Sequence, residues 1–235
     1  MATGHPLRRN DLQKMYKVEI MPTYSKEQID LVAFPSGPLG TNAYLIVCKK
    51  TNKAALVDAP PESIIKVVRE CEKRGATLDK FILTHSHWDH IAESSLVSLR
   101  PYVHTEDAYN LRAPGSDKVN TWMSIEPVEP LGLIKEGDII HVGESSWKVI
   151  HTPGHTPGGI CLYSAEEGML ISGDTLFRGS MGRLDIPTGE PERMWNSLKK
   201  LSTLPPETRV FPGHGGTTTI GQEGWLSHAE QYFGH

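Results

Sequence analysis

Residues 84–90 read Thr-His-Ser-His-Trp-Asp-His, and this stretch decides how the rest of the chain is interpreted. It places three histidines and one aspartate within six residues, directly after the apolar residues 81–83. Imidazole nitrogens and carboxylate oxygens are the ligands that zinc and other first-row divalent metals prefer. The alternative is a surface loop in which Asp89 caps the next helix, and an aspartate can do both. We therefore predict a metal-binding loop that follows a buried strand.

Outward from this loop, short apolar strands alternate with amphipathic helices. We predict strands at residues 44–47, 54–57, 81–84, 102–104, 139–142, 147–151, 160–163, 169–172 and 209–211. We predict helices from Ile64 to a stop at Gly75, from Asp89 toward Leu99, and from Pro191 through Leu201. This alternation is typical of the α/β class with layered sheets and helices. Residues 112–125 show no clear period, and we predict a loop over the site there.

The length of the chain fits one such domain. Its 235 residues are enough for a layered α/β domain with a sizeable core. Residues 1–29 show little periodicity, so we assign them to an N-terminal extension and residues 30–235 to the domain. Arg8, Arg9 and Lys14 leave an organellar presequence open, although the extension has no signal-peptide apolar region.

The composition argues against several classes of partner. With a net charge of −4 and 22% charged residues, we expect neither nucleic acid nor a membrane as a partner. No run approaches the ~20 apolar residues of a membrane span. Cys48, Cys71 and Cys161 are far apart, which indicates reduced thiols in a cytoplasmic protein. The oligomeric state stays open.

Three more predicted strands end in Gly- or Pro-rich turns that carry a histidine or an aspartate. Taken singly, these residues are more typical of turns or packing, but strand ends at one sheet edge can bring them to one cleft. The candidate ligands are then His85, His87, Asp89, His90, His155, Asp174 and His214. Seven ligands exceed what one zinc ion takes. We therefore predict two divalent metal ions that share a carboxylate, with zinc first and iron or manganese as alternatives.

Four motifs together carry a resemblance to a known family. His-Ser-His-Trp-Asp-His at 85–90, Thr-Pro-Gly-His-Thr at 152–156, Ser-Gly-Asp-Thr at 172–175 and Pro-Gly-His-Gly at 212–215 resemble the motifs of the metallo-β-lactamase superfamily. The stretch from Asp174 to Arg183 is similar to short members of its glyoxalase II-like (hydroxyacylglutathione hydrolase-like) branch. The resemblance implies an αββα sandwich with the metals at one edge of the two sheets.

The resemblance also implies roles for individual residues. One metal would be held by His85, His87 and His155, the other by Asp89, His90 and His214, with Asp174 as the bridge. Asp58 matches an aspartate that orients the ligand loop. Arg183 matches a basic position that contacts the carboxylate or the glutathione backbone of the substrate.

The implied activity is hydrolysis of a small-molecule thioester such as S-lactoylglutathione, with Asp89 and Asp174 as catalytic residues and a metal-bridging hydroxide as the nucleophile. Two alternatives share the fold: a mononuclear iron persulfide dioxygenase, and a lactonase or other ester hydrolase. Those dioxygenases usually carry Ala before the last histidine, where this chain has Gly213. Only about twenty residues follow His214, so we expect no counterpart of the helical domain with which longer relatives bind glutathione.

Overall fold

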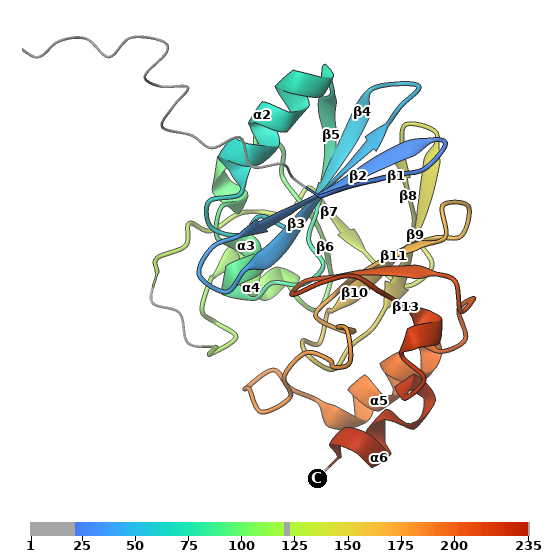
Figure 1. Ribbon diagram of the computed structural model, residues 1–235. Coiled ribbons are helices and arrows are strands. Elements are labelled where there is room, and N and C mark those ends of the chain that lie inside the picture. Colours follow the sequence, from blue (N-terminus) through green and yellow to red (C-terminus); the bar gives the residue numbers. More distant parts are fainter. Residues whose placement is uncertain (1–21, 120–122, 235) are drawn as a thin grey trace, which may run out of the picture.

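The computed structural model describes residues 22–119 and 123–234. Two β-sheets that pack face to face form its centre (Figure 1). The first sheet consists, in spatial order, of β1 (Thr23–Ser25), β2 (Ile29–Ser36), β3 (Thr41–Cys48), β4 (Lys53–Val57), β5 (Thr77–Ile82), β6 (Tyr102–His104) and β7 (Gly132–Ile134). The second consists of β13 (Thr218–Thr219), β12 (Arg209–Pro212), β11 (Met169–Gly173), β10 (Ile160–Ser164), β9 (Ser145–His151) and β8 (Ile139–Val142).

Helices cover the outer face of each sheet, so that the domain has four layers (Figure 1). Against the first sheet lie α2 (Ile64–Arg74), α3 (Trp88–Ile91) and α4 (Ala108–Arg112), with η1 (Ser94–Leu96) after α3. Against the second lie α5 (Pro191–Leu201), η2 (Ile220–Gln222), η3 (Leu226–His228) and α6 (Ala229–Phe233). The predicted αββα sandwich is confirmed.

Apolar side chains fill the space between the two sheets. Trp147 and Phe211 of the second sheet meet Tyr44 and Ile46 of the first, and all four are at most 2% exposed. β3 is buried at all eight positions, because the second sheet covers one of its faces and the helices cover the other. Its sequence therefore lacks the apolar–polar alternation of a half-exposed strand.

Strand direction explains why the candidate ligands gather at one edge. β4 and β5 run parallel to each other, and so do β11 and β12. The loops that follow carboxyl ends of parallel strands lie at the same sheet edge. At that edge the two sheets are joined, because Asn42 of β3 donates its backbone N–H to the carbonyl oxygen of Gly213 and its side-chain N–H to that of Pro212.

Two of the three predicted helices are confirmed. α2 ends at Gly75, whose φ of 62° gives the left-handed C-cap that glycine allows, and α5 begins at Pro191. The prediction of a helix from Asp89 toward Leu99 is wrong, because α3 ends at Ile91. The chain turns at Glu93, whose carboxylate accepts two backbone N–H groups at the start of α2.

The first sheet begins earlier in the chain than we predicted, and the eight-residue β2 was also not predicted. Residues 23–25, which we assigned to the N-terminal extension, form β1 and pair with β2. Residues 1–21 of that extension lie outside the described residues. The short elements α4, α6, β7 and β13 were not predicted, because two to five residues are too few to show a period. Within the described residues no helix is both long and apolar enough to span a membrane.

Candidate metal centre

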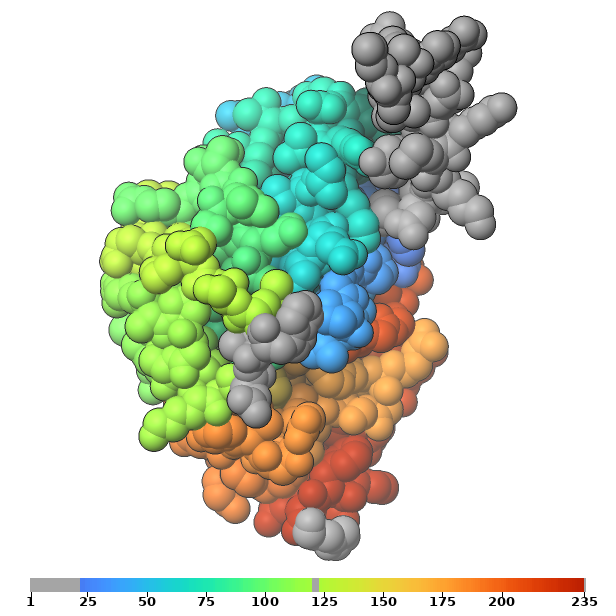
Figure 2. Space-filling model, turned by 90° about the vertical axis from the view of Figure 1, so that its left-hand side faces the viewer, coloured from blue at the N-terminus to red at the C-terminus, as the bar shows by residue number. Residues whose placement is uncertain are grey.

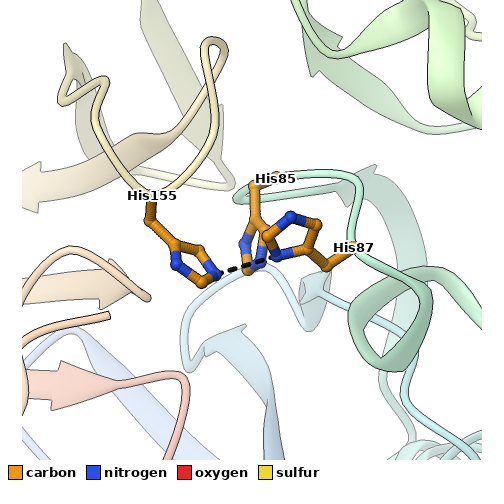
Figure 3. Close-up of side chains that lie close together, drawn as sticks. All are labelled: His85, His87 and His155. Carbon is orange, nitrogen blue, oxygen red and sulfur yellow. Dashed lines mark hydrogen bonds between the residues drawn. The ribbon is translucent and has the colours of Figure 1, made fainter. Parts of the chain in front are cut away.

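Three histidines from two loops form the first ligand group. His85 and His87 lie in the loop after β5, and His155 lies in the loop after β9. Figure 3 shows their rings turned toward one another, with His87 Nδ1 and His155 Nε2 2.8 Å apart. The ring centroids of the three lie between 4.4 and 5.1 Å from one another. Three convergent imidazoles can hold one divalent metal ion.

A second group combines two histidines with a carboxylate. Asp89 and His90 belong to α3, and His214 follows β12. The Asp89 Oδ2 atom lies 3.3 Å from His214 Nε2 and 3.6 Å from His90 Nε2. These three ligand atoms can hold a second ion.

Asp174 lies between the two groups. Its Oδ2 atom is 3.4 Å from the Nε2 atoms of both His155 and His214. Its Oδ1 atom is 3.3 Å from His90 Nε2. One carboxylate therefore faces a histidine of the first group and both histidines of the second. The structure thus brings all seven predicted ligands together, with Asp174 in the position of a bridge.

Hydrogen bonds on the far side of each ring orient the first group. The Thr188 hydroxyl donates to the His155 carbonyl oxygen, so toward His87 Nε2, 3.0 Å away, it acts as the acceptor. His155 Nδ1 donates to the carbonyl oxygen of Arg183 at 2.8 Å. Because each outer nitrogen carries the proton, the other nitrogen of each ring points into the site with its lone pair, as metal ligation requires.

The second group is oriented in the same way. His90 Nδ1 lies 2.8 Å from Asp58 Oδ2, to which it donates. His214 Nδ1 donates to the carbonyl oxygen of Leu39 at 3.3 Å. Both rings therefore turn Nε2 toward Asp174. A carboxylate behind a ligating histidine also makes that histidine a stronger metal ligand.

Asp58 contacts both Thr84, which precedes the ligand loop, and His90. Its φ of 62° is in the left-handed region, which aspartate adopts more readily than most residues. Its Oδ1 atom accepts the Thr84 backbone N–H, and its Oδ2 atom accepts the Thr84 hydroxyl. The same hydroxyl oxygen is 3.1 Å from His85 Nδ1. Asp58 thus contacts His90 directly and His85 through Thr84.

The donor set fits divalent metal ions. Three buried atoms of the site have no hydrogen-bond partner among the described residues: His85 Nε2, His90 Nε2 and Asp174 Oδ1. Leaving a buried polar atom unpaired costs about 1–3 kcal/mol. Metal ions held by the two groups would engage all three atoms, so the residues present form a site for two ions.

In the metal-free protein the two groups differ in protonation. Burial lowers the pKa of His87 to about 3 and that of His85 well below its usual value. Burial also disfavours charge on His214, but hydrogen bonds to carboxylates outweigh it and raise its pKa to about 9. Burial also disfavours charge on His90, but the carboxylates of Asp174, Asp89 and Asp58 outweigh it and raise the pKa of His90 well above its usual value. Burial raises the pKa of Asp89, yet His90 and its other partners bring it down to about 2.

The site opens into a cavity of about 820 Å³. Its apolar lining consists of Leu39, Trp88, Val119, Phe177, Ile186 and Pro187. Lys118 and Arg183 add positive charge. Three segments lie near one another on the face shown in Figure 2. They are the β2–β3 turn (blue), the loop after α4 (yellow-green) and the loop after β11 (orange). Residues 118 and 119 of the predicted loop over the site line this cavity, whereas residues 120–122 lie outside the described residues.

Arg183 takes part in the site mainly through its backbone. Its carbonyl oxygen holds His155, and its side chain lines the cavity. The guanidinium makes two hydrogen bonds of 2.9 Å to Asp185, and the side chain is 72% exposed. A contact with substrate would have to share or replace that ion pair, and it stays a prediction.

A further histidine cluster lies behind the His155 loop. His104 and His151 stack with centroids 3.9 Å apart and an angle of 16° between their planes, and Glu106 lies beside them. Arg193 already pairs with Glu106 at 3.1 Å, and His151 Nε2 donates to the carbonyl oxygen of Pro157 at 2.9 Å. Because these partners already engage the cluster, we assign it to packing.

The sequence did not reveal several side chains that support the ligands. Thr41 donates its hydroxyl to Asp89 Oδ2 at 2.6 Å, Thr188 fixes His87, and Asp107 accepts backbone N–H groups from two ligand loops. Each comes from a segment remote in sequence from the ligand it supports, so spacing carries no signal for it. Only the motif resemblance could point to such a residue, as it did for Asp58.

Comparison with known proteins identifies the family. The model of the metallo-β-lactamase superfamily matches residues 36–214. The chain belongs to the metallo-β-lactamase superfamily. An uncharacterized protein from Aquifex aeolicus is 36% identical over 197 residues, which cover 80% of this chain and 91% of that protein. The hydroxyacylglutathione hydrolase of Cereibacter sphaeroides is 35% identical over 188 residues, which cover 79% of this chain and 66% of the enzyme. The resemblance to the glyoxalase II-like branch is thereby confirmed.

Solved structures of the superfamily share the fold. The BLEG-1 B3 metallo-β-lactamase is 31% identical, with a TM-score of 0.72 over 82% of this chain and 95% of its own. TTHA1623 in a di-iron-bound form is 36% identical, with a TM-score of 0.70 over 81% of this chain and 96% of its own. ETHE1 from Myxococcus xanthus is 25% identical, with a TM-score of 0.69 over 84% of this chain and 82% of its own.

Proposed function

We propose that this protein is a dinuclear metal-dependent hydrolase of small-molecule thioesters of the S-lactoylglutathione type. The observation that carries the proposal is the position of Asp174, within 3.4 Å of histidines from both ligand groups. The similarity to a hydroxyacylglutathione hydrolase supports a thioester as the substrate. The di-iron form of TTHA1623 supports two metals. We propose zinc as the metal, with iron or manganese as alternatives.

When bound, two divalent ions supply a hydroxide nucleophile at neutral pH and polarise the carbonyl that it attacks. The residues of the chain would position the two ions. Asp174 fixes the distance between the two groups, and Asp89 adds negative charge to the second group. A thiolate leaves without strong help from an acid, which fits a cavity in which we assign no separate proton donor.

The cavity suits a thioester with an apolar and an anionic part. Phe177, Ile186 and Pro187 offer apolar surface close to His214 and His155, and Lys118 and Arg183 offer charge for a carboxylate. We keep Arg183 as the proposed contact for the carboxylate. The chain matches only 66% of the hydroxyacylglutathione hydrolase, so the thiol carrier that it accepts is part of the proposal.

A mononuclear iron dioxygenase is the second candidate, and the similarity to ETHE1 favours it. Gly213 argues for the hydrolase. A Cβ atom at residue 213 would lie 2.1 Å from Asp174 Oδ1, so alanine there would displace that carboxylate. With glycine, Asp174 can stay between the two groups. A lactonase or other ester hydrolase would use the same site and differ only in the leaving group.

Protein that is first freed of metal and then loaded with zinc, iron or manganese will test the proposal. We expect release of thiol from S-lactoylglutathione with at least one of these metals, and none from the metal-free protein. Oxygen uptake with glutathione persulfide by the iron-loaded protein, together with no thioester cleavage under any loading, would establish the dioxygenase instead. Cleavage of a neutral lactone, without cleavage of the thioester, would instead support the lactonase.

We also propose a cytoplasmic location and no nucleic-acid or membrane partner. The three cysteines are free in the structure, as a reducing compartment would keep them. Fractionation of the source cells, with the full chain detected by antibody, tests the location.

A further inference from the structure

We propose that Asp107 and Asn110 are positioning residues that clamp the two loops of the first histidine group to each other. Asp107 precedes α4 and Asn110 lies within it, and each is 1% exposed. Neither is a ligand. The proposal concerns the spacing of His85, His87 and His155, and it holds whether the site hydrolyses thioesters or performs another reaction of the family.

The first half of the clamp holds Ser86, the residue between His85 and His87. The Ser86 backbone N–H donates to Asp107 Oδ2 at 2.8 Å. Its carbonyl oxygen accepts from Asn110 Nδ2 at 2.5 Å. Both backbone polar groups of Ser86 are therefore held by Asp107 and by Asn110 of α4. Neither of the two peptide units that flank Ser86 can rotate without breaking one of these bonds.

The second half holds the loop that carries His155. The other oxygen of the carboxylate, Asp107 Oδ1, accepts the Gly158 backbone N–H at 2.6 Å. A Cβ atom at residue 158 would lie 2.6 Å from both the backbone nitrogen and the Oδ1 atom of Asp107, so only glycine allows this approach. One carboxylate thus spans the two loops, and across that span His87 Nδ1 and His155 Nε2 lie 2.8 Å apart.

Asn110 extends the clamp toward the cavity. Its Oδ1 atom accepts the backbone N–H groups of Gly115 and Asp117, and its Nδ2 atom also donates to Asp117 Oδ2. The next residue, Lys118, lines the cavity with a φ of 61°, a backbone conformation that most residues avoid. The same side chain therefore holds a metal-ligand loop and the turn that leads into the cavity wall.

This arrangement supports the first group more directly than the second. Among the described residues, Asp107 bonds to Ser86, between His85 and His87, and to Gly158 in the His155 loop. Asp58, in contrast, bonds directly to His90 and reaches His85 only through Thr84. Loss of the clamp should therefore weaken metal binding by the first group selectively. Residues that orient ligands typically change metal affinity by about 10- to 100-fold.

Amide hydrogen exchange on the metal-free protein tests the clamp without any metal or substrate. Asp107→Asn keeps the shape but turns an NH₂ group toward one of the two N–H donors, which removes an acceptor. We expect the Ser86 or the Gly158 amide to exchange about tenfold faster or more, since one lost hydrogen bond to a charged acceptor is worth at least that factor. Glu70→Gln, another buried carboxylate that pairs with Arg74 far from the site, is the matched control and should leave both amides unchanged.

Metal titrations in two backgrounds then test the selectivity. His214→Ala leaves the first group intact, and His87→Ala leaves the second. Asp107→Asn should weaken zinc binding about 10- to 100-fold in the first background and leave it unchanged in the second. Gly158→Ala, which pushes on Asp107 from the other loop, should reproduce the effect if Asp107→Asn folds poorly.

Unchanged exchange at both amides would overturn the clamp. Faster exchange with unchanged zinc affinity in the His214→Ala background would reduce Asp107 to a fold-stabilising residue and overturn the positioning role. Neither result depends on catalysis. If these measurements hold and no thioester is cleaved, the proposed function fails while this inference stands.

Discussion

Both ligand groups contain histidines, but they differ in charge. The first consists of three histidines whose outer nitrogens face neutral groups, such as the Thr188 hydroxyl and the Arg183 carbonyl oxygen. The second contains Asp89, and its His90 donates to the carboxylate of Asp58. In the metal-free protein the first group is therefore uncharged at His87, whereas the second carries protons on its histidines.

The difference separates two ways of preparing a metal site. The first group depends mainly on geometry, because burial keeps His85 and His87 neutral and these rings need only be held at the right spacing. The second group depends mainly on charge, because its carboxylates favour positive charge nearby. In the metal-free protein, protons on His90 and His214 supply that charge. Asp174 belongs to both groups, so it couples them.

The largest expected effect comes from Asp174→Asn. An amide cannot carry the negative charge that both groups share, so we expect the rate of thioester hydrolysis to fall about 10³-fold or more. Metal analysis after dialysis should show losses from both groups. Glu70→Gln, which removes an equally buried charge from α2, is the control and should keep full metal content. Loss of only one ion would assign Asp174 to a single group and remove the coupling.

Lowering the pH should separate the two groups. The pKa of His214 is raised to about 9, so below that pH a metal ion must displace a proton from the second group. We expect affinity for zinc in the His87→Ala protein, which reports the second group, to fall by at least about tenfold per pH unit below pH 9, because His90 is also protonated and must lose its proton as well. In the His214→Ala protein, affinity should depend less on pH, since burial lowers the pKa values of His85 and His87, that of His87 to about 3. Equal pH dependence in the two variants would contradict the difference in protonation.

Gly213→Ala should disturb the bridge without removing any ligand. The added Cβ atom would lie 2.1 Å from Asp174 Oδ1 and 2.9 Å from His90 Cε1, so the second group must shift. We expect affinity for the second metal to fall about 10- to 100-fold, with the first metal retained. Zinc titration with competition by a chelator measures both steps. The matched variant is Gly216→Ala, three residues further on, where a Cβ atom meets only the end of the Arg178 side chain, and it should bind two metals normally. If Gly213→Ala behaves like Gly216→Ala, then Gly213 does not argue for the hydrolase over the dioxygenase.

The candidate ligands could be chosen from the sequence because each lies in a short motif at a strand end. Strands with a short apolar run, such as β10, and helices with a clear apolar period, such as α2, could be predicted from that local pattern. The helix expected from Asp89 toward Leu99 could not, because its end is set by a distant contact. The Glu93 carboxylate accepts the backbone N–H groups of Glu62 and Ile64 at the start of α2, and the helix ends before Glu93.

The difference in protonation between the two groups could not be predicted from the sequence either. Nothing in the spacing shows that His87 lies beside Thr188 or that His90 faces Asp58. Those contacts arise where separate loops meet at the sheet edge, and they decide which ring nitrogen carries a proton. The motif therefore predicts which residues ligate, whereas the packing around them decides their charge.

The smallest expected effect concerns Arg183, whose backbone and side chain have separate roles. Its carbonyl oxygen holds His155, and any residue at this position keeps that oxygen. Arg183→Ala should therefore leave both metals in place. Its exposed guanidinium pairs with Asp185, and an exposed pair of this kind contributes little to stability. We expect Arg183→Ala to raise KM for an anionic thioester about threefold to tenfold with kcat unchanged, since an exposed contact to a carboxylate is worth on the order of 1 kcal/mol. Asp185→Asn is the matched variant: it frees the guanidinium and should lower KM for the same substrate. A neutral thioester should respond to neither change. If KM for the anionic thioester is the same in both variants as in the wild type, Arg183 serves the site through its backbone alone.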